Sequence, residues 1–272
     1  MLNLVLGAAL LYSFVVVVVF LLQRDFMYFP DQSKPDPAQS VVPEMGVVNY
    51  KTFDGISISS WYYPPKDKKL PVVVHFHGNA GNIGDRAGRA RMLIDKGYGV
   101  LLAEYRGYGG NGGTPDEPGL IFDAKAALDF LDSQGIAPEQ IVVYGESLGS
   151  GVVVPIVMDM AFDGRHVKAV ILEAPFSSAV DVGRAHYGFF PVGLLLKDRF
   201  ESTPRISAIR APLLLIHGEK DAVVPMKLGQ KLFAAALEPK KSAWIVGAGH
   251  SDLYKFGAEK IVLDFLDEVS AN

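Results

Sequence analysis

The chain has 272 residues, of which 49% are hydrophobic, and its formal net charge at pH 7 is only −4. This length and composition indicate one folded domain of ordinary size, and the interspersed charges exclude the strongly basic surface typical of nucleic-acid binding. The chain contains no cysteine, which excludes a disulfide framework, a thiolate zinc site and a cysteine nucleophile.

The first 24 residues differ from the rest of the chain. Residues 2–22 are almost wholly apolar, and as a helix of about 30 Å they match the hydrocarbon core of a bilayer. We expect residues 1–24 to be a single-pass transmembrane anchor. A cleaved signal peptide is the alternative, but the run lacks a basic start and a small-residue cleavage site. Arg24 and Lys34 follow the span, which slightly favours a cytoplasmic location for the domain that comes next.

Residues 25–45 are rich in Pro, Asp, Ser and Gln, and we interpret them as a linker or an extended arm. A folded domain is predicted for residues 46–272. It begins with a β-hairpin, because the strand-like segments 47–53 and 56–63 flank the turn signal Asp54-Gly55.

After this hairpin, short apolar runs alternate with helical patterns. The runs predicted as strands are residues 71–76, 99–103, 140–144, 167–172, 212–216 and 242–246. Helices are predicted over residues 83–96, 119–133 and 226–237, from about residue 147, and at the C-terminus. Continuous apolar strands that alternate with helices indicate an α/β fold, with a mostly parallel central sheet covered by helices on both faces.

The sequence Gly145-Glu146-Ser147-Leu148-Gly149 fits the pattern G-x-S-x-G. A predicted strand precedes it and a predicted helix follows it, which is the strand–turn–helix context of a nucleophile elbow. Glycines two residues on either side of the serine allow a sharp turn without crowding. Ser147 is therefore the candidate nucleophile, and the simpler alternative is a glycine-rich turn with a capping serine.

Two further residues follow later strands in the order expected for a Ser-Asp-His triad. Asp221 comes after the run 212–216, and His250 comes after the run 242–246. In such a triad the histidine takes the serine proton and the carboxylate orients the imidazole. Glu219 and Asp252 are rival acids, but Glu219 comes early in its loop and Asp252 is a near neighbour of His250.

The segment after the first parallel strand carries two histidines, His75 and His77. On a strand they share one face, but the sequence offers no third ligand, so we expect no metal site. This segment occupies the position that supplies a second oxyanion N–H in hydrolases with a nucleophile elbow. His166, His186 and His217 are interpreted as structural.

Several ordered motifs resemble the α/β-hydrolase superfamily. They are HGNAGN at 77–82, YRGYG at 105–109, GESLG at 145–149, HG at 217–218 with Asp221, and GH at 249–250. The resemblance covers about residues 26–270 and is greatest to the membrane-anchored bud-emergence-type branch, which includes protein depalmitoylases. It implies an α/β-hydrolase fold, a triad of Ser147, Asp221 and His250, and oxyanion-hole N–H groups from Asn79 and Leu148. This chain departs from the depalmitoylases, because it has a hydrophobic span and no N-terminal cysteines.

In this fold a cap is inserted between two core strands, and residues 177–211 occupy that place. The cap is small. Its apolar stretch contains Phe189, Phe190, Leu194 and Leu195, which could line an acyl pocket or pack on the sheet.

The predicted function is hydrolysis of carboxylic esters or thioesters through an acyl-enzyme, without a cofactor. The expected partners are a membrane and a small-molecule or lipid-like acyl substrate, with no nucleic acid. A serine peptidase is the alternative enzyme, because the same triad cleaves amides in related folds. A membrane-tethered binding protein without activity is the alternative from another class. The sequence does not indicate the oligomeric state.

Overall fold

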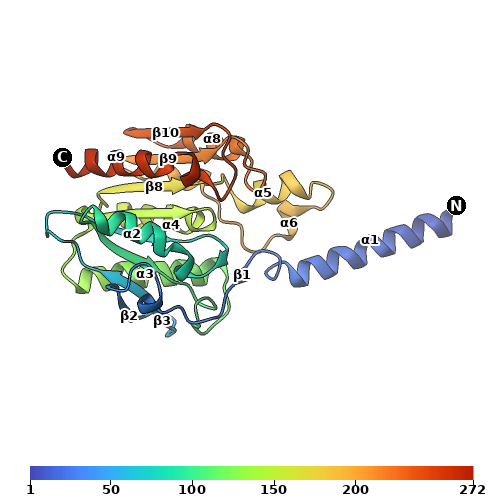
Figure 1. The fold of residues 1–272 in the computed structure, drawn as a ribbon. Helices are drawn as coiled ribbons and strands as arrows, with labels where there is room; N and C mark the ends of the chain where they lie inside the picture. Colours follow the sequence, from blue (N-terminus) through green and yellow to red (C-terminus); the bar gives the residue numbers. More distant parts are fainter. Residues whose placement is uncertain (272) are drawn as a thin grey trace.

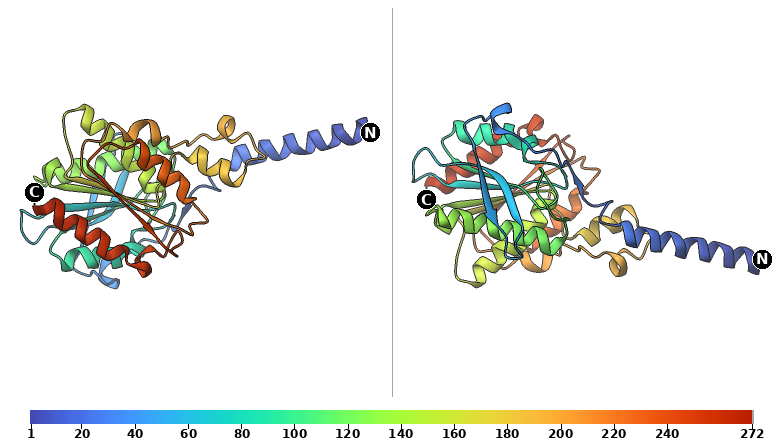
Figure 2. Two further views of the ribbon diagram at one scale, coloured as in Figure 1. Left: turned by 90° about the horizontal axis from the view of Figure 1, so that it is seen from above. Right: turned by 90° about the horizontal axis from the view of Figure 1, so that it is seen from below.

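The computed structural model describes residues 1–271, and one long helix, α1 (Leu2–Leu22), projects from its globular part (Figure 1 and Figure 2). None of the 21 residues of α1 is buried. Within the described residues, this is the one helix long and apolar enough to cross a membrane, and N-terminal signal sequences share that property.

The centre of the globular part is a mostly parallel sheet. Its strands are β2 (Gly46–Lys51), β3 (Ser57–Tyr63), β4 (Val72–Phe76), β6 (Gly99–Ala103), β7 (Ile141–Glu146), β8 (Ala169–Glu173), β9 (Leu213–Gly218) and β10 (Lys240–Ile245). Over residues 1–271 their order is β10-β9-β8-β7-β4-β6-β3-β2. β3 pairs antiparallel with β2 and β6, and the other pairs are parallel.

Helices cover both faces of this sheet (Figure 1). One face carries α3 (Glu117–Ser133), α4 (Leu148–Phe162) and α8 (Met226–Ala235), and the other carries α2 (Ala87–Asp95) and α9 (Ala258–Ala271). Each face of the sheet has its own hydrophobic core. Along β4, Val72, Val74 and Phe76 pack in the core beneath α3, α4 and α8, and Val73 packs in the core beneath α2 and α9. Burial on both faces explains the continuous apolar strands. The predicted fold class is confirmed.

Short 3₁₀ helices complete the connections: η1 (Pro37–Gln39), η2 (Ile83–Arg86), η3 (Pro138–Gln140) and η4 (Leu253–Phe256). The segment 25–45, interpreted as a linker or an arm, packs along the domain. Its strand β1 (Phe29–Pro30) pairs in parallel with β5 (Ala80–Gly81), and Val42 is fully buried. Through these contacts the segment packs against the domain.

The region expected to form a cap, residues 177–211, lies between β8 and β9. It contains α5 (Ala179–His186), α6 (Val192–Leu195) and α7 (Thr203–Ile206). In Figure 1, α5 and α6 lie on the side of the domain from which α1 emerges. The cap therefore sits between the sheet and the N-terminal helix.

Candidate active site

Ser147 lies in the turn between β7 and α4, where its backbone adopts φ 50° and ψ −112°. Positive φ is strained for a residue other than glycine and is common at functional sites. A Cβ on Gly145 would lie 2.7 Å from the carbonyl oxygen of Gly149, and a Cβ on Gly149 would lie 2.1 Å from that of Phe76. The glycines are thus needed for this turn, which has the strand–turn–helix geometry predicted from G-x-S-x-G.

His250 and Asp221 reach Ser147 from the loops after β10 and β9. His250 Nε2 lies 2.9 Å from Ser147 Oγ, and His250 Nδ1 lies 2.7 Å from Asp221 Oδ2. The second oxygen of Asp221 accepts the backbone N–H groups of Val223 and Val224 at 2.9 and 2.7 Å. The structure therefore brings the three predicted side chains into one hydrogen-bonded chain.

Asp221 is held as a carboxylate by its surroundings. Burial raises its pKa, but hydrogen bonds from His217 and His250 outweigh burial and hold the pKa well below its ordinary range. His217 Nε2 lies 2.8 Å from the carbonyl oxygen of Val224 and 3.2 Å from Asp221 Oδ2. A carbonyl can only accept, so this nitrogen carries a proton and donates. Sequence reasoning missed this second partner, although the i,i+4 spacing of His217 and Asp221 was visible.

The two rival acids contact the backbone near His250 and not its ring. Asp252 Oδ1 accepts the N–H of Gly249 at 2.7 Å, and Glu219 Oε2 accepts the N–H of Gly247 at 3.3 Å. Both carboxylates therefore shape the loop that carries His250. In the described residues Asp221 is the carboxylate bonded to the imidazole.

The two backbone N–H groups predicted to bind an oxyanion belong to Leu148 and Asn79. Leu148 begins α4, so its N–H has no partner four residues earlier in the helix. Asn79 follows β4. Its side chain donates to the carbonyl of Met27 at 2.9 Å, and its carbonyl accepts from the N–H of Phe29 and the hydroxyl of Tyr108, both at 2.8 Å. None of these bonds uses the Asn79 backbone N–H.

A network of charged side chains underlies the turn, and sequence reasoning missed it. Glu146 bonds Arg86 at 2.8 and 3.2 Å and lies 3.2 Å from Arg89, which also pairs with Glu173. Arg86 also donates at 3.2 Å to the carbonyl of Ala80, which follows Asn79 and begins β5. The network thus connects the turn to β5. The charged residue inside the G-x-S-x-G pattern was the visible signal.

His75 and His77 have separate partners. His75 packs edge-on against Tyr144, with ring centroids 4.8 Å apart. His77 Nδ1 donates to the carbonyl of Gly78 at 2.7 Å, and its Nε2 lies 2.6 Å from Glu104 Oε1. Over residues 1–271 no cluster of three or more His, Asp or Glu side chains has the arrangement of a metal site.

The side chains suggested for an acyl pocket are not gathered at Ser147. Phe189 and Leu194 are 68% and 88% exposed. The ring of Phe190 stacks on Tyr12 of α1, and the carbonyl of Leu195 accepts from Gln23. Phe190 and Leu194 line a hollow in the cap that does not include Ser147, so the acyl pocket stays a prediction. The sequence could not show that the cap faces α1.

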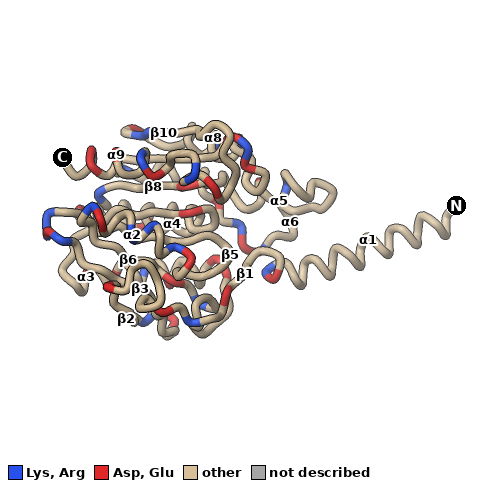
Figure 3. The backbone as a smooth tube through the Cα atoms, in the orientation of Figure 1, with Lys and Arg blue, Asp and Glu red and all other residues tan. Residues whose placement is uncertain are grey.

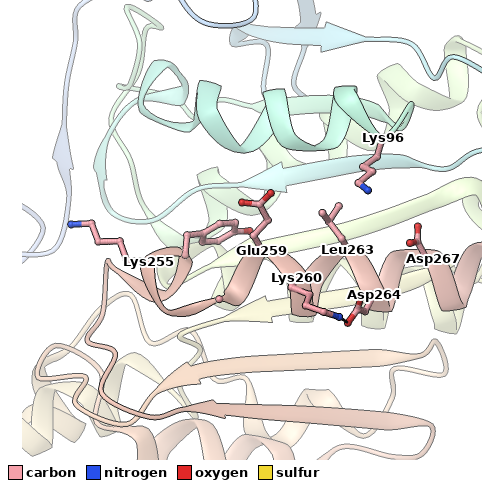
Figure 4. Close-up of a pocket in the computed structure, with 9 residues that line it drawn as sticks. Lys96, Lys255, Glu259, Lys260, Leu263, Asp264 and Asp267 are labelled. Carbon is pink, nitrogen blue, oxygen red and sulfur yellow. Dashed lines mark hydrogen bonds and ion pairs between the residues drawn. The ribbon is translucent and has the colours of Figure 1, made fainter.

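Two hollows lie away from the triad. One, of about 490 Å³, runs along α9 between Lys96, Tyr254 and Asp267 (Figure 4). The other, of about 460 Å³, lies in the cap and is lined by Arg184 and Phe190 among others. Neither is lined by Ser147, Asp221 or His250, so neither is the place where chemistry would occur.

Known proteins are similar to this chain in sequence or in fold. The family model described as "Serine aminopeptidase, S33" matches residues 67–188. The uncharacterized protein Rv2307c of Mycobacterium tuberculosis is 40% identical over 246 residues, which cover 90% of this chain and 86% of that protein. The uncharacterized protein YfhR of Escherichia coli K12 is 30% identical over 252 residues, with 89% and 85% coverage.

The names of two similar proteins state an activity. Lysophosphatidylserine lipase ABHD12 of Danio rerio is 32% identical over 197 residues, which cover 67% of this chain and 51% of that protein. The solved structure of the Pyrococcus furiosus esterase Pf2001 has a TM-score of 0.69 at 21% identity, with coverage of 89% of this chain and 98% of that one. At that identity the structural match shows a shared fold.

Proposed function

Because this chain belongs to the α/β-hydrolase superfamily and is a hydrolase of the esterase/lipase type, we propose that it cleaves carboxylic esters or thioesters with Ser147, His250 and Asp221 as its triad. The observation that carries the proposal is the chain of hydrogen bonds from Ser147 Oγ through His250 to Asp221. The strained backbone of Ser147 supports it further, because it presents the hydroxyl at the N-terminus of α4.

The proposed reaction follows from these contacts. Ser147 Oγ attacks the acyl carbon while His250 Nε2 takes the hydroxyl proton, and the carbonyl oxygen becomes an oxyanion. The backbone N–H groups of Asn79 and Leu148 stabilise that oxyanion. His250 then gives its proton to the leaving alcohol or thiol, and an acyl-enzyme remains. Water releases the acid by the same steps, while Asp221 stabilises the imidazolium throughout.

We also propose that the substrate is lipid-like and that α1 anchors the enzyme in a membrane. The similarity to a lysophosphatidylserine lipase supports an acyl substrate with an amphiphilic character. The apolar surface of α1 supports a single-pass anchor over residues 1–24, with the hydrolase domain on the cytoplasmic side as the slightly favoured orientation.

A fluorophosphonate probe tests the nucleophile. Full-length protein in detergent micelles should be labelled at Ser147, and Ser147→Ala should lose both labelling and turnover by several orders of magnitude. The variant should keep its thermal unfolding temperature, because one hydroxyl is lost. Labelling of another serine in the variant would refute the assignment.

A substrate series separates the esterase from the peptidase suggested by the family description. We would compare kcat/KM for 4-nitrophenyl esters of increasing acyl length, acyl thioesters, lysophospholipids and aminoacyl anilides. Turnover of the esters and lysophospholipids, with the anilides much slower, is expected. Faster turnover of the anilides would favour an aminopeptidase.

A further inference from the structure

One apolar part of the cap stands out from the surface of the domain. Residues 187–196, hereafter the cap tip, contain no charged side chain, and Arg184 and Lys197 flank them. Phe189 and Leu194 are 68% and 88% exposed. Large apolar side chains exposed on one short uncharged segment are typical of a surface that contacts a membrane or another molecule.

The cap tip lies along the C-terminal half of α1 (Figure 1). The hydroxyl of Tyr12 donates to the carbonyl of Phe189 at 2.9 Å, and its ring stacks on Phe190 with centroids 6.2 Å apart. Nearer the domain, Gln23 donates to the carbonyl of Leu195 at 3.2 Å and accepts the N–H of Lys197 at 2.7 Å. The contacts therefore extend from the middle of the helix to its end.

Helix length decides what these contacts mean for a membrane. From Tyr12 to Gln23 the helix rises about 16 Å, roughly half of a hydrocarbon core of about 30 Å. If that half lay outside the bilayer, residues 2–11 would supply a helix of only about 15 Å, which is too short to cross. A membrane-spanning α1 therefore carries the cap tip into the leaflet with it.

We propose that the cap tip is a second membrane-embedded element, inserted in the leaflet next to the domain, where lipid acyl chains cover Phe189 and Leu194. This inference rests on the proposed anchoring by α1. Removal of these apolar side chains from water favours insertion.

Much of the backbone of the cap tip is hydrogen-bonded to protein groups. Irregular backbone is tolerated in a bilayer where its polar groups have protein partners. The N–H groups of Phe190, Val192 and Leu194–Leu196 donate to carbonyls within the cap tip or at its base. The carbonyls of Phe189, Gly193 and Leu195 accept from Tyr12, Arg199 and Gln23, respectively.

The charges are placed where the headgroups would lie. Figure 3 shows α1 without charged residues along its length, and charges begin at its end nearest the domain. There Lys197 Nζ lies 4.5 Å above the ring of Phe20, and Arg24 pairs with Asp198. Basic side chains at the end of an apolar element interact favourably with lipid headgroups. These charges mark the boundary between the apolar part of α1 and the hydrolase domain.

The absence of cysteine makes a direct test possible. An environment-sensitive fluorophore would be attached to single cysteines in full-length protein reconstituted in phosphatidylcholine vesicles. The variants are Phe189→Cys and Leu194→Cys in the cap tip, Leu10→Cys in α1, and Phe162→Cys as the matched control. Phe162 is 75% exposed, which is similar to the 68% exposure of Phe189. It lies at the end of α4 that is far from Ser147.

At positions 189, 194 and 10 we expect a blue-shifted emission, quenching by nitroxides on lipid acyl chains, and loss of quenching by aqueous iodide. At position 162 we expect the opposite. Aqueous behaviour at 189 and 194 with a lipid environment at 10 overturns the inference and leaves the anchor intact. Aqueous behaviour at position 10 overturns the anchor and the inference together. Ser147→Ala should not change the pattern, so the outcome is independent of the proposed catalysis.

Discussion

Arg24→Ala should destabilise the cap, because Arg24 is the main partner of a buried carboxylate. Arg24 Nε and Nη2 donate to the two oxygens of Asp198 at 2.8 and 2.9 Å, and this hydrogen bonding raises the pKa of Arg24. The Asp198 side chain is only 3% exposed. After the substitution the carboxylate would keep the hydroxyl of Tyr28, at 3.1 Å, as its partner.

The free energy of unfolding should fall by an amount between the values known for buried and for surface ion pairs. Breaking a buried ion pair costs about 3–5 kcal/mol, whereas an exposed pair contributes about 0–1 kcal/mol. The Arg24 side chain is 37% exposed, so water can partly replace it. We therefore expect a loss of about 2 kcal/mol, which for a domain of this size lowers the unfolding temperature by roughly 4–8 °C.

Thermal unfolding in detergent micelles, followed by tryptophan fluorescence, measures this loss. Arg165→Ala is the control, because Arg165 pairs with Asp163 on the surface at 3.5 Å and should change stability by less than about 0.5 kcal/mol. The double variant with Asp198→Asn should recover part of the loss, because the orphaned charge is then removed. Equal stabilities of Arg24→Ala and Arg165→Ala would refute the reasoning.

The ion pair between Arg24 and Asp198 also determines how stable N-terminal deletion variants should be. Removal of residues 1–22 keeps Gln23 and Arg24 with their cap partners, whereas removal of residues 1–24 loses both. The shorter deletion should therefore give the more stable domain, by about the loss expected for Arg24→Ala.

Further predictions concern the triad and the turn. Asp221→Asn should lower kcat by about 10⁴, with Glu219→Gln much milder, and comparable losses in the two variants would contradict the assigned acid. The folded protein depresses the pKa of Asp221 below 3.8, so the ionised carboxylate stabilises the fold above that pH, and this stabilisation is lost as the pH falls further. The unfolding temperature of Asp221→Asn should lack this part of the decrease in acid. Gly149→Ala should cost about 3 kcal/mol, because its Cβ would lie 2.1 Å from the carbonyl oxygen of Phe76. Gly88→Ala in α2 meets nothing within 4 Å and should gain about 1 kcal/mol, so equal unfolding temperatures for the two alanine variants would disprove the packing argument.

The sheet could be predicted because its signal is local. The run 99–103 was predicted as a strand and forms β6 with the same bounds. A strand that is buried on both faces needs an unbroken apolar run, and such a run can be recognised directly in the sequence. The turn at Ser147 was likewise visible, because its two glycines are required by contacts within a few residues of one another and with the adjacent strand.

The contacts of the segment 25–45 and the short helices of the cap could not be predicted in the same way. β1 is only two residues long, and its partner β5 lies some fifty positions later in the chain. Gly188, Pro191 and Gly193 break the periodicity of the cap, so its short helices have no clear pattern. Gln23 and Arg24 looked like ordinary residues at the end of an apolar span, because their partners in the cap are brought near by tertiary structure.

The chain that leaves α1 contacts the cap first and Asn79 next. Gln23 and Arg24 bond cap residues, and a few positions later the backbone of Met27 and Phe29 bonds Asn79. The predicted oxyanion N–H of Asn79 is thus held by the segment that links the domain to its proposed anchor. A pull on α1 that shifted this segment would move the Asn79 N–H relative to Ser147, and a small displacement of an oxyanion donor costs a large factor in rate. We therefore expect a change in the position of α1 in the membrane to affect kcat as well as substrate access.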